Sequence, residues 1–325
     1  MKNKVDIIGI GECLIDFVTD ERDGVLHLTG NPGGAPANVL AMATRLGLST
    51  AMIAKVGDDR FGQFLRRHIT AAGVDDAHLI ATGEYPTTLA MVSLDEQGNR
   101  SFSFYRGQTA DVMLRADELP LDTIEHSRVL HFGSVSLTHQ PSRDATFAAV
   151  RHAREHGAII SYDPNLRRPL WAALSEAKCE IEKGLALSDV VKLSEEELFF
   201  LTGTDSLEAG IEALYARYPL QLLAVTLGPD GCILRTQNGV YRSRTFDVPC
   251  VDTTGAGDAF WGACLAWLLL QDKPASELSE PEITALMDFA NAAGSLATTK
   301  KGAIPAMPTG EEIRDCIRDI PRVAQ

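Results

Sequence analysis

The sequence predicts a three-layer α/β/α fold, with a mostly parallel central sheet between two helical layers and a small additional β-sheet. Short apolar runs of strand length alternate with longer helical patterns along the chain, as in successive β–α–β units. Several of these runs are apolar throughout, which is typical of parallel strands covered on both faces. A hairpin pattern near residue 95 interrupts the alternation, and a lone hairpin is only marginally stable in water, so we expect it to join further strands.

Length and charge restrict the domain organisation and the partners. A chain of 325 residues could form one large α/β domain or two ordinary ones, and since no linker or internal repeat is visible we expect a single domain over residues 1–325. The net charge of −14 argues against a nucleic acid or an anionic membrane as partner. The longest apolar run, residues 261–270, is half of the roughly 20 residues that a membrane span needs. The N-terminal residues resemble a first strand and not a signal peptide.

The cysteines indicate a reducing compartment. The chain has six of them, none in a C-x-x-C pair, and several lie inside apolar runs. This pattern predicts buried free thiols in a cytoplasmic protein, and neither a disulfide framework nor a zinc site.

Twelve segments and one further helix make up the predicted β–α alternation. Each is bounded by glycine, proline or polar residues that end or begin regular structure. We expect strands at 5–10, 50–56, 129–133, 159–162, 189–193, 222–226 and 232–235, and helices at 37–46, 61–72, 142–157, 259–270 and 283–299, with Ser194 capping one further helix. The hairpin is expected at 87–94 and 100–105 around a turn at 96–99, with 18–29 as its partner.

Two polar clusters follow predicted strands in the first part of the chain. Asp16 comes shortly after the first strand, where open α/β sheets bind ligands, although an isolated surface aspartate is the simpler reading. In GNPGGAPAN, Gly33 and Gly34 permit close backbone approach, and Asn38 offers both a donor and an acceptor to a hydroxylated ligand. A glycine–proline turn before a helix is the alternative. The G-x-G after the first strand lacks the third glycine of a dinucleotide fingerprint.

The segment VDTTGAGDAFWGACL, residues 251–265, carries the clearest chemical signal. The small residues Gly255, Ala256 and Gly257 at a helix start leave backbone N–H groups able to hold an anion. Asp258 beside them would repel a phosphate, unless it takes a proton from a hydroxyl that attacks the held phosphoryl group. A helix-capping aspartate is the alternative reading.

The helix predicted at 142–157 carries two histidines near its end. His152 and His156 stand four residues apart on a predicted helix, a spacing that suits a metal. A solvated helix face is the favoured reading, because a metal site also needs a third ligand and supporting hydrogen bonds.

The string GAGD after DTT resembles the C-terminal signature of the ribokinase-like sugar kinases, the PfkB group, and GG-x-x-x-N resembles their N-terminal signature. The resemblance implies a ribokinase-like fold that phosphorylates a sugar hydroxyl with ATP and Mg²⁺, with Asp258 as general base and the Gly255–Ala256–Gly257 backbone as anion hole. It also implies that the small sheet, formed from about 14–30 and 86–107, is a lid over the sugar site and a surface for homodimer formation. No Walker A string occurs, which excludes a P-loop kinase.

The resemblance further assigns residues to the two substrates. For the sugar it implies Asp16, Gly33, Gly34, Asn38, Phe104, Arg106 and Arg167, the last within a D-x-N-x-R pattern similar to that of fructokinases and 2-keto-3-deoxygluconate kinases. For the nucleotide it implies Lys192, Glu195, Thr226, Gly228, Gly231, Gly257 and Asn291, with Lys192 standing where the family's N-x-x-E pattern has asparagine. It implies a potassium site formed by Asp252, Thr254, Ala297 and Gly302.

Among the members of this family, the FYR pattern of residues 104–106 is closest to the fructokinases, which convert ATP and D-fructose to ADP and D-fructose 6-phosphate. A 2-keto-3-deoxygluconate kinase, with Arg106 or Arg167 holding the sugar carboxylate, remains an alternative, as does a ribokinase, a nucleoside kinase or an aminoimidazole riboside kinase. A sugar-binding regulator on the same fold is an alternative of another class, and the intact GAGD string argues against it.

Overall fold

Two β-sheets organise the computed structural model, which describes residues 5–94 and 100–324. In this part of the chain, nine strands form the large sheet in the order β13-β12-β11-β10-β9-β8-β1-β4-β5. Neighbouring strands from β11 to β5 are parallel, and β12 and β13 add an antiparallel edge. The second sheet has the order β3-β2-β6-β7.

The strands are mostly short, as expected for a buried parallel sheet. Those of the large sheet are β1 (Ile7–Ile10), β4 (Thr50–Gly57), β5 (Leu79–Thr82), β8 (Val129–Phe132), β9 (Ile159–Tyr162), β10 (Val190–Ser194), β11 (Leu222–Thr226), β12 (Cys232–Thr236) and β13 (Gly239–Ser243). Those of the small sheet are β2 (Leu14–Arg22), β3 (Val25–Gly33), β6 (Leu89–Leu94) and β7 (Arg100–Tyr105).

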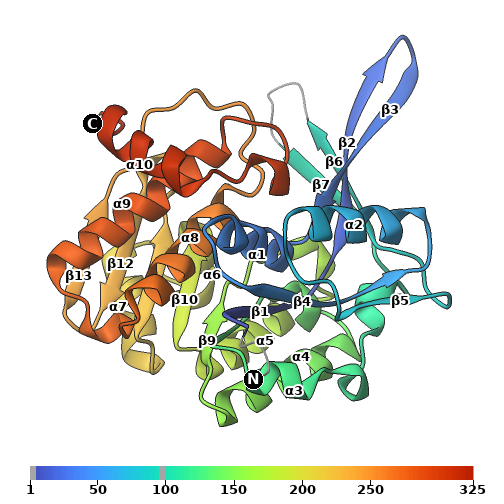
Figure 1. Ribbon diagram of the computed structural model, residues 1–325, viewed down its shortest axis with the longest axis horizontal. Helices are drawn as coiled ribbons and strands as arrows, with labels where there is room; N and C mark the ends of the chain where they lie inside the picture. The colour runs from blue at the N-terminus through green and yellow to red at the C-terminus, as the bar shows by residue number, and fades with distance from the viewer. Residues whose placement is uncertain (1–4, 95–99, 325) are drawn as a thin grey trace.

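Helices cover both faces of the large sheet (Figure 1). They are α1 (Ala35–Arg45), α2 (Arg60–Ala71), α3 (Leu121–Glu125), α4 (Ser142–Glu155), α5 (Leu174–Leu187), α6 (Glu195–Thr202), α7 (Leu207–Arg217), α8 (Ala256–Gln271), α9 (Glu280–Ala297) and α10 (Gly310–Asp319).

Alternation along the strands divides the apolar core in two. In β1, Ile7 belongs to the core shared with α1, α2, α8, α9 and α10, while Ile8 belongs to the core shared with α3 to α7. Successive strand residues point to opposite faces of a sheet, so this division places one helical layer on each side. The three-layer prediction is confirmed.

Helix α8 is apolar around its circumference, and its Trp261 and Cys264 are fully buried. It packs against α1 on one side and α9 on the other. A Cβ at Gly262 would lie 2.7 Å from the Cβ of Met42, so only glycine permits the observed approach of α8 to α1. This close crossing brings the starts of α1 and α8 to the same place.

The small sheet stands beside the main body, and the hairpin of β2 and β3 projects from it (Figure 1). β2 pairs antiparallel with β3 and parallel with β6, and β6 pairs antiparallel with β7. Val25, Leu26 and Leu28 of β3 are exposed by 47–62%, which is unusual for large apolar side chains on one strand.

Every strand and helix predicted from the sequence is present, with boundaries that differ by a few residues. The sequence analysis did not identify β5, β13, α3, α5, α7 or α10. The predicted turn at 96–99 lies outside the described residues. All six cysteines are free thiols, but the expectation of burial is wrong for Cys179 and Cys250, which are exposed. Across residues 5–94 and 100–324, no helix is both long and apolar enough to cross a bilayer.

Candidate active site

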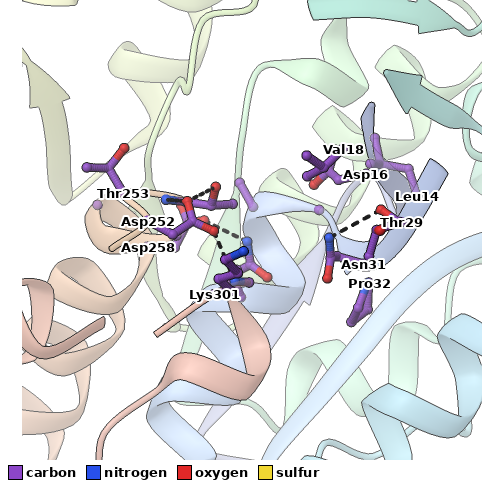
Figure 2. A pocket seen from close by; sticks show the side chains of 18 of the residues that line it. Leu14, Asp16, Val18, Thr29, Asn31, Pro32, Asp252, Thr253, Asp258 and Lys301 are labelled. Atoms are coloured by element: carbon purple, nitrogen blue, oxygen red, sulfur yellow. Dashed lines mark hydrogen bonds between the residues drawn. The ribbon is translucent and has the colours of Figure 1, made fainter. Parts of the chain in front are cut away.

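A cavity of about 930 Å³ lies between the small sheet and the edge of the large sheet where the parallel strands end. Asp16, Gly34 and Asn38 line it from the N-terminal part of the chain, and Lys192 and Asp258 line it from the C-terminal part. Figure 2 shows Asp16 and Val18 of β2 on one side, and Asp252, Thr253 and Asp258 on the other. The sequence-predicted residues of both signatures therefore meet at one site.

The start of α8 has the features of an anion-binding site. Its N-cap, Gly255, has a φ of 77°, and no side chain caps the first turn. A Cβ at Gly255 would lie 2.6 Å from the Cβ of Ala303, so both backbone conformation and space require glycine. The first N–H groups of a helix have no partner within it, and here both Gly255 and Gly257 line the cavity. A phosphoryl group placed there would meet these donors and the positive end of the helix dipole.

Asp258 lies in the first turn of α8 and is 8% exposed. Its Oδ2 accepts a 2.8 Å hydrogen bond from Nδ2 of Asn38 in α1. The other amide atom of Asn38, Oδ1, is buried and has no hydrogen-bond partner among the described residues. The two signatures, 220 residues apart, are thus joined by a direct hydrogen bond that fixes the carboxylate at the cavity wall.

Burial, followed by the nearby charge of Asp163, raises the pKa of Asp258, and its net value is about 6. The hydrogen bond from Asn38 and the charges of Lys192 and Arg167 act in the opposite direction. The ordinary value for aspartate is ~3.9. The carboxylate therefore remains mostly ionised at neutral pH but is a stronger base than a solvated aspartate.

Lys192 is a buried cation beside the anion site. Its Nζ donates a 2.7 Å hydrogen bond to Oδ2 of Asp163, and the two side chains are 8% and 1% exposed. A Cβ on Gly257 would lie 3.3 Å from Nζ of Lys192, so the ammonium group is adjacent to the first turn of α8. Lys192 is thereby placed to add positive charge where a transferring phosphoryl group would lie.

Asp16 faces Asp258 from the small sheet. It comes shortly after β1 and lies within β2, inside the segment expected to form the small sheet, where it is paired with Asn31 of β3. A Cβ at Gly33 would lie 2.1 Å from Oδ2 of Asp16, so the glycine makes room for this carboxylate. The pKa of Asp16 is raised to about 6, mainly by burial, with a lowering by the charge of Arg167 and a further raising by that of Asp258 included in this value.

Phe104 and Arg167 also line the cavity, in agreement with their assignment to the sugar side. Arg106 does not. Its guanidinium is fully buried and donates to Asp111 Oδ2 at 2.7 Å, Thr138 Oγ1 at 2.6 Å and the carbonyl of Val135 at 3.0 Å. The structure gives Arg106 the role of joining β7 to the segments that follow β8, and this geometry does not support the predicted substrate contact.

Of the seven residues assigned to the nucleotide, Lys192 and Gly257 line this cavity and the other five do not. Gly231 has a φ of 94°, and a Cβ there would lie 2.1 Å from the carbonyl oxygen of Ser243. The backbone of this turn therefore requires glycine at this position. Asn291 donates to the carbonyl of Arg244 at 3.3 Å. Thr226 Oγ1 donates to the carbonyl of Leu193, and Gly228 begins the turn with a φ of 58°.

Glu195 is the first residue of α6 and lies outside the cavity lining. The buried acid at this turn is Glu197. Its Oε1 accepts from the N–H of Leu166 and its Oε2 from the N–H of Ser194, both at 2.7 Å. Ser194 caps α6 in return, as the sequence predicts. Glu197 thus ties the loop that carries Arg167 to the end of β10.

Three of the residues assigned to a potassium site come together. Oδ1 of Asp252 accepts from the N–H and hydroxyl of Thr254, and Oδ2 accepts from the N–H of Gly302 at 3.0 Å. Ala297 ends α9, and the carbonyl of the next residue, Thr298, accepts from the N–H of Asp252 at 3.0 Å. Carboxylate, hydroxyl and carbonyl oxygens suit a hard cation such as potassium, so the donor types fit the predicted ion.

Glu12 and Lys301 are charged residues of the cavity lining that the sequence analysis did not assign. Glu12 follows Gly11 directly after β1; its Oε1 accepts from the N–H of Ala35 at the start of α1, and its Oε2 is buried without a partner among the described residues. Burial raises the pKa of Glu12 to about 7. Lys301 reaches the cavity from the loop after α9 and lies near Asp252 in Figure 2. The glycine before Glu12 and the Lys300-Lys301-Gly302 string were the available signals.

Comparisons with known proteins agree with this geometry. The family model described as pfkB family carbohydrate kinase matches residues 4–310. Fructokinase-1 of Zea mays is 42% identical over 315 residues, which are 96% of this chain and 97% of that protein.

Solved structures of fructokinases are similar to this chain over almost its whole length. A fructokinase of Xylella fastidiosa with bound ATP superposes with a TM-score of 0.88 at 35% identity, over 98% of this chain and 99% of that one. A double-mutant fructokinase of Vibrio cholerae O395, bound to fructose, ADP and a potassium ion, has a TM-score of 0.86 at 34% identity, over 98% and 100% of the two chains. The chain described here belongs to the pfkB family of carbohydrate kinases.

Proposed function

We propose that this protein is an ATP-dependent fructokinase that transfers the γ-phosphoryl group of ATP to the 6-hydroxyl of D-fructose, with Asp258 as general base. The observation that carries the proposal is the placement of a buried carboxylate, Asp258, at the uncapped start of α8 and opposite the sugar-side carboxylate Asp16. The similarity of the whole chain to fructokinases supports fructose as the acceptor.

In the proposed reaction the sugar oxygen attacks the γ-phosphorus, a new O–P bond forms, and the bond from phosphorus to the bridging oxygen of ADP breaks. The hydroxyl proton passes to Asp258. Because the transition state for phosphoryl transfer is loose, proton removal contributes less than alignment and charge stabilisation. The N–H groups of Gly255, Ala256 and Gly257 and the ammonium group of Lys192 are the groups of this chain that would stabilise the transferring phosphoryl group.

Asp16, Asn38 and Arg167 are proposed to hold the sugar. Asp16 would accept hydrogen bonds from two neighbouring hydroxyl groups, and the free Oδ1 of Asn38 would accept another. Gly33 and Gly34 make room for this arrangement, since a Cβ at Gly34 would lie 2.4 Å from the carbonyl oxygen of Glu12. Phe104 would cover the apolar side of the sugar.

The nucleotide and ions complete the proposal. We propose that the turn containing Thr226, Gly228 and Gly231, together with Asn291 and Glu195, holds the nucleotide. Mg²⁺ would be bound mainly through the ATP phosphates and would neutralise their developing charge. Asp252, Thr254 and the backbone of Ala297 and Gly302 are the proposed residues for potassium.

We also propose that residues 1–325 form a single kinase domain, with β2, β3, β6 and β7 as its lid. The exposed apolar residues of β3 support a homodimer formed through the lids. Six free thiols and dependence on ATP support a cytoplasmic location.

The first experiment measures ADP release by the purified protein with Mg-ATP and potassium, with fructose, ribose, 2-keto-3-deoxygluconate, adenosine and aminoimidazole riboside as separate acceptors. The proposal predicts the highest kcat/KM with fructose. A preference for the sugar acid 2-keto-3-deoxygluconate would indicate that Arg167, which lines the cavity, determines acceptor specificity by binding the sugar carboxylate. Absence of turnover with every acceptor would leave the fold unaffected and would contradict the assignment as a fructokinase. Asp258→Asn protein prepared in parallel controls for contaminating kinases.

A further inference from the structure

We propose that Glu125, His152 and His156 form a binding site for a zinc-class divalent transition-metal ion, remote from the cavity and independent of catalysis. His152 lies in the last turn of α4, His156 directly follows that helix, and Glu125 ends α3. The histidine spacing alone did not justify a metal site from the sequence, because a third ligand was missing. The structure supplies that ligand from a separate helix.

The three side chains converge on one point. The Nε2 atoms of His152 and His156 lie 4.0 Å and 3.7 Å from the same oxygen of Glu125, Oε2. One ligand atom from each residue lies within 4.8 Å of the others. Zinc bonds are about 2.0–2.2 Å long for histidine nitrogen and carboxylate oxygen, so small side-chain rotations around a central ion would satisfy all three bonds.

The hydrogen bonding of His156 leaves the correct nitrogen available. Its Nδ1 lies 2.8 Å from the carbonyl oxygen of His152. A carbonyl oxygen only accepts hydrogen bonds, so Nδ1 of the neutral ring carries the hydrogen and Nε2 presents a lone pair. A metal-binding histidine typically donates its other ring N–H to a backbone carbonyl in this way, which fixes both tautomer and ring orientation.

Nε2 of His152 is buried and has no hydrogen-bond partner among the described residues. If both rings are neutral, their nitrogen lone pairs point toward a carboxylate oxygen, and a metal ion bound between the three atoms would replace this repulsion by attraction. Two imidazoles and one carboxylate favour zinc-class ions over magnesium, which prefers oxygen alone.

The site lies at the opposite edge of the large sheet from the cavity. Glu125 precedes β8 and His156 precedes β9, so both are at the starts of parallel strands, whereas Asp163 and Lys192 are at or near strand ends. In Figure 1, α3 and α4 lie together at the side away from the lid. A metal ion there would join α3 to α4, and binding would stabilise the folded chain by an amount that grows with the logarithm of ion concentration above the dissociation constant.

The test measures zinc binding by calorimetry near pH 7.5, in the absence of nucleotide and magnesium. All proteins carry Cys179→Ser and Cys250→Ser, since these two thiols are exposed and could bind zinc themselves. The parent protein is expected to bind one zinc ion, and His156→Gln to lower that affinity by at least about tenfold, as loss of one ligand commonly does. Glu125→Gln is expected to lower it as well, and the fructokinase activity with Mg-ATP should be unchanged in both variants.

His68→Gln is the matched control. His68 lies in α2, and its Nδ1 also bonds to the carbonyl of the residue four positions earlier, Phe64, at 2.9 Å. It belongs to neither of the groups of metal-binding side chains in the described part of the chain. Its substitution should leave zinc affinity unchanged. Equal affinity in the parent and in His156→Gln, or no zinc binding by the parent, would overturn the proposal, whatever the outcome of the kinase assay.

Discussion

The helices that enter the cavity begin differently from those that only support the fold. Among the helices of the described residues, α1 and α8 alone have glycine at the N-cap, Gly34 and Gly255, each with a positive φ and no capping side chain. The N-caps of helices α2, α6, α7 and α10 are Asp59, Ser194, Ser206 and Thr309. The side chain of each accepts a hydrogen bond from a backbone N–H of the first turn.

The difference separates stability from function. A capping side chain satisfies one of the N–H groups that a helix start leaves unpaired, and it stabilises the fold by about 1 kcal/mol. A glycine N-cap has no side chain that could accept such a hydrogen bond, so it lacks this stabilisation and leaves the N–H groups of the first turn available to a ligand. The four predictions below test this separation: three change one helix start each, and one changes the pH.

The largest effect is expected at the acid in the first turn of α8. Asp258→Asn keeps the size of the side chain but removes the base, so kcat should fall by about 10²–10⁴-fold. Binding of fructose and ATP should be retained, because the anion-binding N–H groups are unchanged. Steady-state kinetics and calorimetry measure the two effects. Retention of near-normal turnover would contradict the assignment of Asp258 as the base.

The next effect is expected at the glycine cap itself. Gly255→Ala must adopt a φ of 77° and place a Cβ 2.6 Å from that of Ala303, so it should lower both kcat and the free energy of unfolding. The left-handed conformation alone costs about 1–2 kcal/mol for alanine. Denaturant unfolding and ADP release are the measurements.

Gly203→Ala is the control for Gly255→Ala, because Gly203 ends α6 with a φ of 73° and a Cβ there would meet no atom within 4 Å. This control should lose stability through backbone strain alone and keep its kcat. Equal loss of kcat in both variants would show that the cap of α8 has no special role in catalysis.

A smaller effect is expected from pH. The pKa of Asp258 and that of Asp16 are both raised by burial to about 6. Protonation of Asp258 removes the base, so kcat/KM should be constant above neutral pH and fall as the pH decreases through about 6. A rate that stays level down to ~4, the usual range of a solvated aspartate, would contradict the raised pKa values.

The smallest effect on activity is expected at a capped helix. Ser206 Oγ accepts from the N–H of Ala209 at the start of α7. Ser206→Ala should lower the free energy of unfolding by about 1 kcal/mol and leave kcat and both KM values unchanged. Thermal unfolding together with the kinase assay tests this, and a changed kcat would mean that capped helices also set the geometry of the site.

The contrast between glycine-capped and side-chain-capped helices also explains which site residues could be predicted from the sequence. Gly33, Gly34, Gly255 and Asp258 were identified because close backbone approach and a base beside an anion site each require particular residue types. The short elements β5 and β13 and the five-residue α3 were missed because their few apolar residues give too little periodicity.

Side-chain partners were harder to predict than elements. Arg106 was assigned to the sugar because its neighbours resemble a family pattern, but whether an arginine faces a cavity or a buried aspartate depends on segments distant in sequence, here Asp111 and Thr138. The raised pKa of Asp258 depends likewise on burial by the folded chain. Such long-range effects have no local signature.

The hydrogen bond between Asn38 and Asp258 has a consequence for synthesis of the protein. A ribosome completes the first signature long before the second, so a nascent chain holding Asn38 has no base and no anion site for 220 further residues. Loss of the C-terminal segment by proteolysis would likewise remove Ala303, against which Gly255 packs. A chain that ends before residue 258 therefore lacks both the proposed base and the proposed anion site, and we expect no phosphoryl transfer before this segment has been synthesised and folded.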